Sequence, residues 1–304
     1  MFQLSVDFFF VLSGFVLTFS MRDRTPAVRS FAIKRVLRLV PVHYVCLAIL
    51  LAIYEFSSTP LPYVPRPLPL STVVADLALA TPILWQTDAV NVPSWSVSWE
   101  LYLPLIAVAL APYVSRLVAR HSAAILAILC VGLSWTAVSV SSGSLLYGLR
   151  ACLGLAAGAC LFATSSRIRI VPRYARPAVL YALITLMFVI MLVAASLSIV
   201  AALFPWVTVA TILVGARTRS LLSSRPAAWL GSISYTLYMV HVPVLVAMTA
   251  VFGSRMTASV GLKGGTIVAA LAMASILTVA VERPAMMLAK RLRAGRRQEV
   301  AAVA

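Results

Sequence analysis

The sequence predicts an all-α protein, a polytopic transmembrane helical bundle of about nine spans with a cytoplasmic C-terminus. The first observation is composition: 62% of the 304 residues are hydrophobic and 11% are charged, against roughly 25% charged residues in soluble domains. The second is length, because repeated apolar runs reach the roughly 20 residues that a helix needs to cross the hydrocarbon core. The third is the placement of basic residues, which alternates from loop to loop.

Each of the nine apolar runs is predicted to form one helix. A shorter segment, 71–86, contains Asp76 and Pro82 and is predicted to lie at the interface or to re-enter the membrane. Residues 1–290 are expected to form one transmembrane domain, followed by a basic cytoplasmic tail over 291–304. The nine predicted spans are 2–20, 40–56, 97–115, 122–141, 145–164, 177–196, 198–216, 229–252 and 265–288.

The basic residues separate two explanations of the net charge of +17. In a soluble protein such a charge would suggest nucleic-acid binding. Here 21 of the 25 Lys and Arg residues lie in every second loop or at the C-terminal end, as the positive-inside rule requires of cytoplasmic segments. We therefore expect no nucleic-acid partner. The same rule places Met1 outside with no basic anchor before the first span, so a preceding helix is expected, which makes ten.

Polar side chains inside a membrane are costly, so each is a candidate functional residue. The first cluster is Asp7 with Ser13 and Gly14, for which helix packing with an interfacial acid is the alternative. In the second cluster, Arg35 and Arg38 stand three residues apart and share a helical face near the cytoplasmic side. Guanidinium pairs suit the phosphates of a cytosolic ligand. The alternative is a topology anchor that meets lipid phosphates.

The third cluster is "NVPSWSVSWELY" (91–102), in which Glu100 stands among aromatic side chains. We predict that Glu100 lies in the first turn of the following span, where the helix dipole favours an acid without any further function. Trp95 and Trp99 flank it, and such surroundings are also typical of functional acids. Because Trp and Tyr gather at membrane interfaces in any case, both interpretations stay open.

The fourth cluster is "LGSISYTLYMVHVPVL" (230–245), in which His241 is about twelve residues into its span and roughly mid-membrane. Ser234 and Tyr238 precede it at helical spacing. An imidazole can transfer a proton near neutral pH, while a hydrogen-bonded packing residue is the alternative. The sequence has no HExxH or CxxC spacing, so no metal site is predicted.

These clusters resemble, in this order, the integral-membrane acyltransferase family 3, the bacterial O-acyltransferases that act on saccharides. Five strings along the whole chain carry the resemblance, each weak alone and specific together. The resemblance implies an enzyme of ten helices in the bacterial inner membrane, with membrane lipids as its neighbours. It would use acyl-CoA, usually acetyl-CoA, as co-substrate and a hydroxyl of a saccharide or glycolipid as acceptor. The strings are "SVDFFFVLSGFVLTFS", "IKRVLRLVPVHY", "PSWSVSWELYLPL", "LGSISYTLYMVH" and "VERP" (281–284).

The resemblance also implies roles for particular residues. Family members carry, on a helix before the present Met1, a basic residue and then a histidine that acts in catalysis. We therefore expect a base from a preceding helix, with Glu100 orienting it, and little activity without that helix. The expected ligands of the CoA phosphates are Arg35 and Arg38, the catalytic candidates are Glu100 and His241, and the expected lining of the substrate cavity is Asp7, Ser13, Trp95 and Tyr238.

Two alternative functions remain compatible with the sequence. A transporter or flippase for a lipid-linked sugar would also be polytopic with buried polar residues, although the sequence shows no internal repeat of the kind common in that class. A catalytically inactive, partner-binding family member is the other alternative. The acceptor is open among lipopolysaccharide, exopolysaccharide, peptidoglycan, a lipid-linked sugar and a small molecule.

Overall fold

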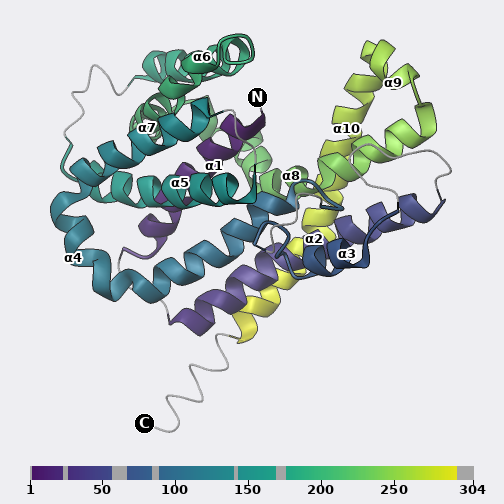
Figure 1. Cartoon of the computed structure of the whole chain (residues 1–304), viewed down its shortest axis with the longest axis horizontal. Coiled ribbons are helices and arrows are strands. Elements are labelled where there is room, and N and C mark those ends of the chain that lie inside the picture. Colours follow the sequence, from purple (N-terminus) through teal and green to yellow (C-terminus); the bar gives the residue numbers. More distant parts are fainter. Residues whose placement is uncertain are drawn as a thin grey trace, which may run out of the picture. The chain divides into compact units, whose positions relative to one another are not determined.

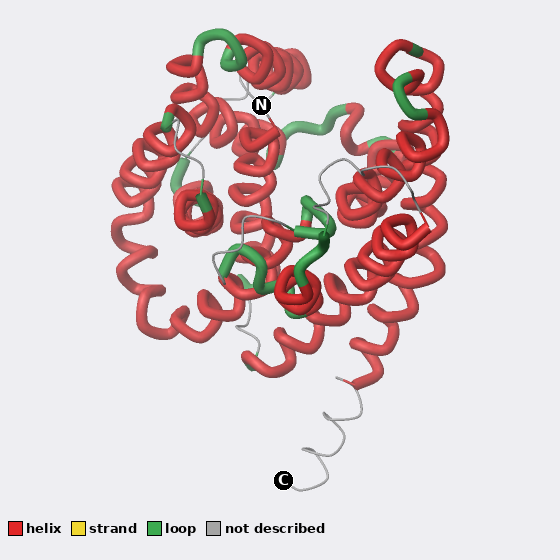
Figure 2. The backbone as a smooth tube through the Cα atoms, turned by 45° about the vertical axis from the view of Figure 1, so that its right-hand side comes forward, coloured by secondary structure: helices red, strands yellow, loops and turns green. Residues whose placement is uncertain are grey.

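A computed structural model gives the fold of the chain. Over the described residues every regular element is a helix, without a strand (Figures 1 and 2). This confirms the predicted all-α class. Most of the proline-rich stretch 58–70 and most of the basic tail lie outside the described residues. The structure describes residues 2–22, 27–56, 67–83, 89–139, 143–168 and 176–292.

The helices match the predicted spans. Within the described ranges, seven helices are long and apolar enough to cross a membrane. One of them, α4 (Ser94–Val138), holds two predicted spans, separated at His121, whose φ of −116° and ψ of 16° are not helical. A further predicted span corresponds to the shorter apolar helix α6 (Pro177–Val193). The prediction of a polytopic helical membrane protein is therefore confirmed.

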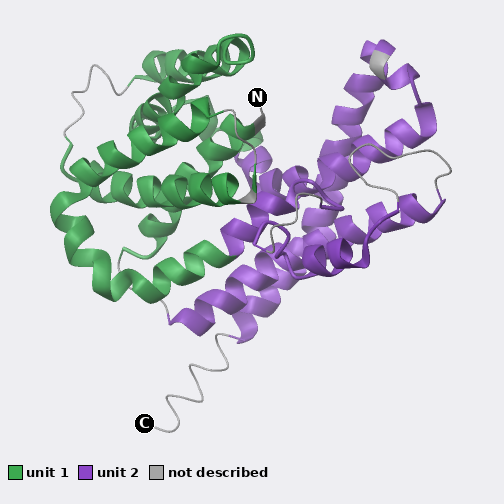
Figure 3. Ribbon diagram, viewed as in Figure 1, with its two compact units in different colours: residues 1–26, 102–227 green, residues 27–101, 228–304 purple. Residues whose placement is uncertain are grey.

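The chain divides into two compact units, each assembled from two separate stretches (Figure 3). Unit 1 comprises residues 1–26 and 102–227, and unit 2 comprises residues 27–101 and 228–304. The helix α4 passes from unit 2 into unit 1 at Tyr102. Neither unit is a continuous segment, because the fold joins helices that are distant in the sequence.

Unit 1 is organised around the packing of α1 (Phe2–Ser20) against α5 (Ser144–Ser165). At Gly14 the two backbones come so close that a Cβ would lie 2.1 Å from the carbonyl oxygen of Leu155. Small residues permit such close approach between membrane helices. The other helical elements of unit 1 are the greater part of α4, α6, the 3₁₀ turn η1 (Ser198–Leu203), α7 (Phe204–Gly215) and the 3₁₀ turn η2 (Leu221–Ser223).

Unit 2 contains the second, fourth and fifth strings and the third string up to Leu101. Its apolar core joins α2 (Val28–Phe56) and α8 (Arg225–Phe252) to the segment before α4, through the buried side chains of Leu47, Leu50, Val90, Val242 and Val246. The other elements of unit 2 are α3 (Leu70–Leu77), the first turns of α4, α9 (Arg255–Ala258), α10 (Val260–Leu277) and the π-helical turn η3 (Thr278–Glu282).

Candidate functional site

The centre of the candidate site is a contact between α2 and α4. The Nε of Arg35 donates to the backbone carbonyl of Glu100 at 2.6 Å, and its Nη2 lies 3.9 Å from the Glu100 Oε2. The side chains are 11% and 25% exposed, respectively. An acid and a base are stable together in such shielded surroundings because each offsets the charge of the other. The fold therefore joins the second and third clusters of the sequence.

The position of Glu100 in its helix differs from the prediction. The helix α4 begins at Ser94, three residues before the predicted start, and its first turn contains no acid. Glu100 lies in the second turn, whereas the effect of the helix dipole falls off within the first. The dipole alone therefore does not account for this acid, and Arg35 is its evident charge partner.

The two arginines of the second cluster have different surroundings. Arg35 is largely buried against Glu100, while Arg38, one turn later in α2, is exposed. Residues three apart on a helix point about 60° away from each other, so a neighbouring helix can cover one and leave the other open. An exposed guanidinium is the better placed of the two for an incoming phosphate.

Two tyrosines of α8 connect this helix to α2 and α4, the helices that carry Arg35 and Glu100. The Tyr235 hydroxyl donates to the carbonyl of Leu39 in α2 at 2.5 Å. The Tyr238 hydroxyl shares a hydrogen bond of 2.8 Å with the Ser96 hydroxyl in α4. The fourth cluster therefore lies in the same site as the second and third. Tyr235 was missed from the sequence, although its spacing of three from Tyr238 marked the same helical face.

His241 has an exposed side chain on α8 and a defined tautomer. Its Nδ1 lies 2.6 Å from the carbonyl oxygen of Tyr238, and its ring centroid is 5.7 Å from that of Tyr238. Because a carbonyl only accepts hydrogen bonds, Nδ1 carries the proton. The Nε2 of His241 is then the nitrogen that can accept a proton.

A buried carboxylate that the sequence did not single out holds the start of α4. Asp76 of α3 is fully buried. Its Oδ1 accepts from the Ser94 hydroxyl at 2.5 Å and from Thr81 at 3.4 Å, and its Oδ2 accepts from the backbone N–H of Asn91 at 3.1 Å. Its backbone carbonyl accepts from His43 of α2 at 2.8 Å. The sequence signal that could have identified Asp76 was the presence of an acid in the short apolar segment 71–86.

Asp76 should therefore control the placement of Glu100 through the first turns of α4. Replacing Asp76 with Ala leaves buried donors of Asn91 and Ser94 without their acceptor, so the free energy of unfolding is expected to fall by about 2–3 kcal/mol. Unfolding in mixed detergent micelles, followed by circular dichroism, measures this change. The control is Ser94→Ala, which removes one hydrogen bond to Asp76 and leaves the bond from Thr81 to the same oxygen, so it should cost about 1 kcal/mol. Equal losses in the two variants would contradict this role.

The fifth string contributes a structural contact. The Thr236 hydroxyl in α8 donates to Oε2 of Glu282 at 2.7 Å. Glu282 lies at the end of η3, the π-helical turn that continues α10. This hydrogen bond ties the last membrane helix to α8, two residues from Tyr238.

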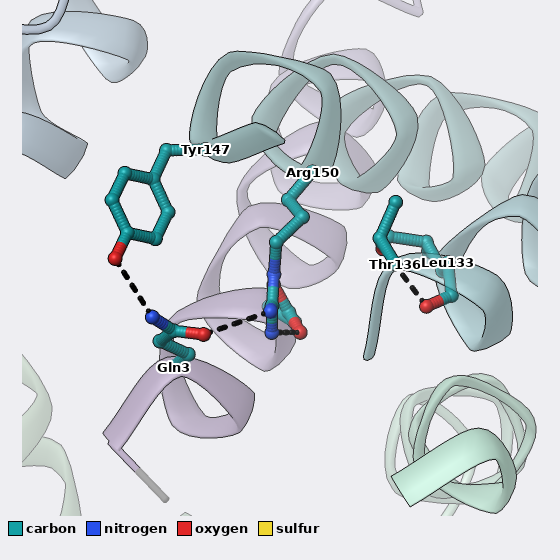
Figure 4. Close-up of polar contacts among 6 residues, drawn as sticks. Gln3, Leu133, Thr136, Tyr147 and Arg150 are labelled. Atoms are coloured by element: carbon teal, nitrogen blue, oxygen red, sulfur yellow. Dashed lines mark hydrogen bonds and ion pairs between the residues drawn. The ribbon is translucent and has the colours of Figure 1, made fainter. Parts of the chain in front are cut away.

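The first cluster lies in unit 1, where Asp7 is paired with Arg150. Figure 4 shows Arg150 with Gln3 and Tyr147. The Nε of Arg150 donates to the Asp7 Oδ1 at 3.0 Å, and its Nη2 pairs with Oδ2. Its Nη1 donates to Gln3 at 3.0 Å, and Gln3 in turn donates to the Tyr147 hydroxyl at 3.0 Å. Asp7 and Arg150 are 4% and 2% exposed. Arg150 falls inside the predicted span 145–164, but the sequence does not identify it as the partner of Asp7.

The remaining predicted site residues are half-buried. Ser13 lies on α1 in unit 1, and Trp95 lies in the first turn of α4 in unit 2. The predicted lining of the substrate cavity is therefore divided: Trp95 and Tyr238 belong to unit 2, and Asp7 and Ser13 belong to unit 1. Their role in substrate binding stays a prediction.

Comparison with known proteins supplies the family. A family model for an acyltransferase domain, that of acyltransferase family 3, matches residues 1–281. No curated protein and no solved structure matches the chain. The matched region covers most of the sequence and includes both partners of the Arg35–Glu100 pair. The chain therefore belongs to acyltransferase family 3 and is a membrane acyltransferase.

Proposed function

We propose that this acyltransferase moves an acyl group, with acetyl the expected one, from acyl-CoA to a hydroxyl of a saccharide or glycolipid. The observation that carries the proposal is the polar site of unit 2, in which Arg35, Glu100 and Tyr238 belong to three helices joined by hydrogen bonds. Polar groups inside a membrane protein cost free energy, so a cluster of them commonly marks a functional site. The proposed location is the bacterial plasma membrane, with acyl-CoA supplied from the cytoplasm.

The donor is held through its phosphates in this proposal. Arg38 is exposed, and a guanidinium binds a phosphate through two parallel hydrogen bonds. Arg35 is engaged with Glu100, so its first role is to place that carboxylate. The proposal therefore gives Arg38 the larger share of CoA affinity and Arg35 the smaller share.

Transfer requires a group that takes the proton of the acceptor hydroxyl. Among the described residues, His241 offers Nε2 for this purpose, because its Nδ1 is bonded to the Tyr238 carbonyl. The hydroxyl oxygen forms the new bond to the acyl carbon, the carbon–sulfur bond breaks, and the proton ends on the thiol of the released CoA. Glu100 keeps in this proposal the role expected from the resemblance, which is to orient a histidine base supplied by a preceding helix. Asp7, Ser13, Trp95 and Tyr238 are the proposed lining of the acceptor side.

Acyl transfer itself is tested with radiolabelled acetyl-CoA and membrane vesicles that contain the protein. The expected result is label in a saccharide or glycolipid fraction, above that of vesicles with a Glu100→Ala variant. Transport of a lipid-linked sugar without any label in glycan would favour the flippase alternative. Label in neither fraction, with the protein folded, would favour an inactive family member.

The phosphate role is tested on Arg38. Replacing Arg38 with Ala is expected to weaken CoA binding by about 10- to 100-fold, because a hydrogen bond to a charged group contributes roughly 1.5–3 kcal/mol. Isothermal titration of the purified protein with CoA measures the affinity. The matched control is Arg29→Ala, which removes an exposed basic residue from the same helix. If both variants bind CoA like the parent, Arg38 is a topology anchor and not a ligand.

A further inference from the structure

Two N–H groups at the candidate site are buried and have no hydrogen-bond partner. They are Nε1 of Trp99 and Nη2 of Arg35. The Arg35 Nη2 faces the Glu100 Oε2 at 3.9 Å, which is an ion-pair distance and too long for a hydrogen bond. Trp99 directly precedes Glu100 in α4, and Arg35 is bonded to the backbone of Glu100, so both belong to the same few residues. The other buried atoms without a partner in the described chain can all accept a hydrogen bond. They are the hydroxyl oxygens of several Ser and Thr residues, one imidazole nitrogen and one amide oxygen. Only the Trp99 and Arg35 groups are obligate donors.

Obligate donors without a partner are unfavourable in a protein interior. A buried donor left unsatisfied costs about 1–3 kcal/mol, and most buried polar groups are paired. One donor belongs to the partner of Glu100 and the other to the residue that precedes Glu100 in α4, and both would be satisfied by a ligand that presents an acceptor oxygen. An indole N–H is neutral and offers no counter-charge, so burying a doubly charged phosphate against it is costly. A neutral carbonyl oxygen suits these donors better than a phosphate.

We propose that the N–H groups of Trp99 and Arg35 bind the thioester carbonyl oxygen of the acyl donor. This inference rests on the proposed function and extends it to the reacting bond. When the acceptor hydroxyl attacks the acyl carbon, negative charge develops on this oxygen, and donors already in place stabilise that charge. The carbon–oxygen double bond then re-forms and the carbon–sulfur bond breaks, which releases the thiolate of CoA. The thiolate takes the proton that the hydroxyl lost. Trp99 is therefore a catalytic residue in the proposal.

The test is Trp99→Phe, which keeps an aromatic ring and removes the N–H. The turnover number for acetyl transfer is expected to fall about 10²-fold, the usual effect of losing one oxyanion donor, while the affinity for CoA, which lacks the carbonyl, stays unchanged. The control is Trp229→Phe, because Trp229 lies in α8 of the same unit and is 46% exposed. It should leave both quantities unchanged.

A second measurement uses the unaltered protein and does not depend on the folding of a variant. Acetyl-CoA is expected to bind about five-fold more tightly than S-ethyl-CoA, its thioether analogue without the carbonyl oxygen, since one neutral hydrogen bond contributes about 1 kcal/mol. In Trp99→Phe this preference should become smaller, because only the Arg35 N–H then remains to bind the carbonyl oxygen. Equal binding of the two ligands by the parent protein would overturn the inference.

The outcomes separate this inference from the proposed function. If the parent protein transfers acetyl groups and Trp99→Phe does so at the same rate, the carbonyl subsite is wrong and the acyltransferase proposal stands. If Trp99→Phe loses affinity for CoA and acetyl-CoA equally with an unchanged turnover number, the donors bind another part of CoA, and the carbonyl assignment is overturned. If the parent protein neither binds acetyl-CoA nor transfers its acyl group, both proposals fail.

Discussion

Replacing Asp7 with Ala is expected to lower the free energy of unfolding by about 3–5 kcal/mol, because it leaves the guanidinium of Arg150 buried without a counter-charge. Arg150 is 2% exposed and donates to both carboxylate oxygens of Asp7. Unfolding in mixed detergent micelles with increasing SDS measures the loss. The reverse change, Arg150→Ala, leaves an unpaired carboxylate and should cost a similar amount.

The control for this prediction removes both charges and keeps hydrogen-bonding groups. The double variant Asp7→Asn with Arg150→Gln should regain most of the stability, because a neutral pair carries a smaller desolvation cost than one buried charge. If Asp7→Ala is as stable as the parent protein, the pair does not hold α1 to α5. Acetyl transfer by the double variant then separates the two roles of Asp7. Retained transfer means that Asp7 is structural, and lost transfer supports its predicted place in the substrate cavity.

Replacing Gly158 with Ala is expected to lower the free energy of unfolding by about 3 kcal/mol, at the upper end of the usual cost of overpacking. A Cβ at Gly158 would lie 2.0 Å from the carbonyl oxygen of Val11 and 2.6 Å from the backbone nitrogen of Phe15. These are backbone atoms, so relief requires that α1 and α5 move apart. Such a movement would also disturb the Asp7–Arg150 pair on the same two helices. The same micelle titration reports the loss.

The control glycine is Gly265 in α10, where a Cβ would meet nothing within 4 Å. There the Gly→Ala change should leave stability unchanged or raise it by up to about 1 kcal/mol, the difference in helix propensity between the two residues. The two substitutions are chemically identical, so opposite signs would show that contact between helices causes the loss at Gly158. A similar loss at both positions would contradict that cause.

The site in unit 2 explains why single motifs of this sequence are weakly informative. Arg35 and Glu100 are 65 residues apart in the chain, and Ser96 and Tyr238 are 142 apart. Each motif supplies one or two polar groups on one helix, and only packed helices give each group a partner. The largest stability losses are expected in unit 1, whereas the acyl-transfer variants at Arg38 and Trp99 lie in unit 2, so the two sets of experiments test different parts of the chain.

The sequence by itself determined the class of protein, the approximate positions of its apolar segments, and the family. These depend on composition and on runs of about 20 residues, which are local properties of a chain whose backbone must satisfy its own hydrogen bonds in lipid. Only the order of five short strings was needed for the family. The start of α4 was predicted three residues late, because Ser94 gains its place from the distant carboxylate of Asp76.

The tertiary structure alone decided which charges meet. Asp7 and Arg150 are 143 residues apart, and nothing in either segment names the other as its partner. Arg35 and Arg38 looked equivalent by spacing, yet packing of α4 against α2 covers one and leaves the other exposed. The physical reason is that a buried charge is stable only when a group of opposite charge lies within a few ångströms. Contacts between packed helices, and not the sequence around each residue, decide which group that is.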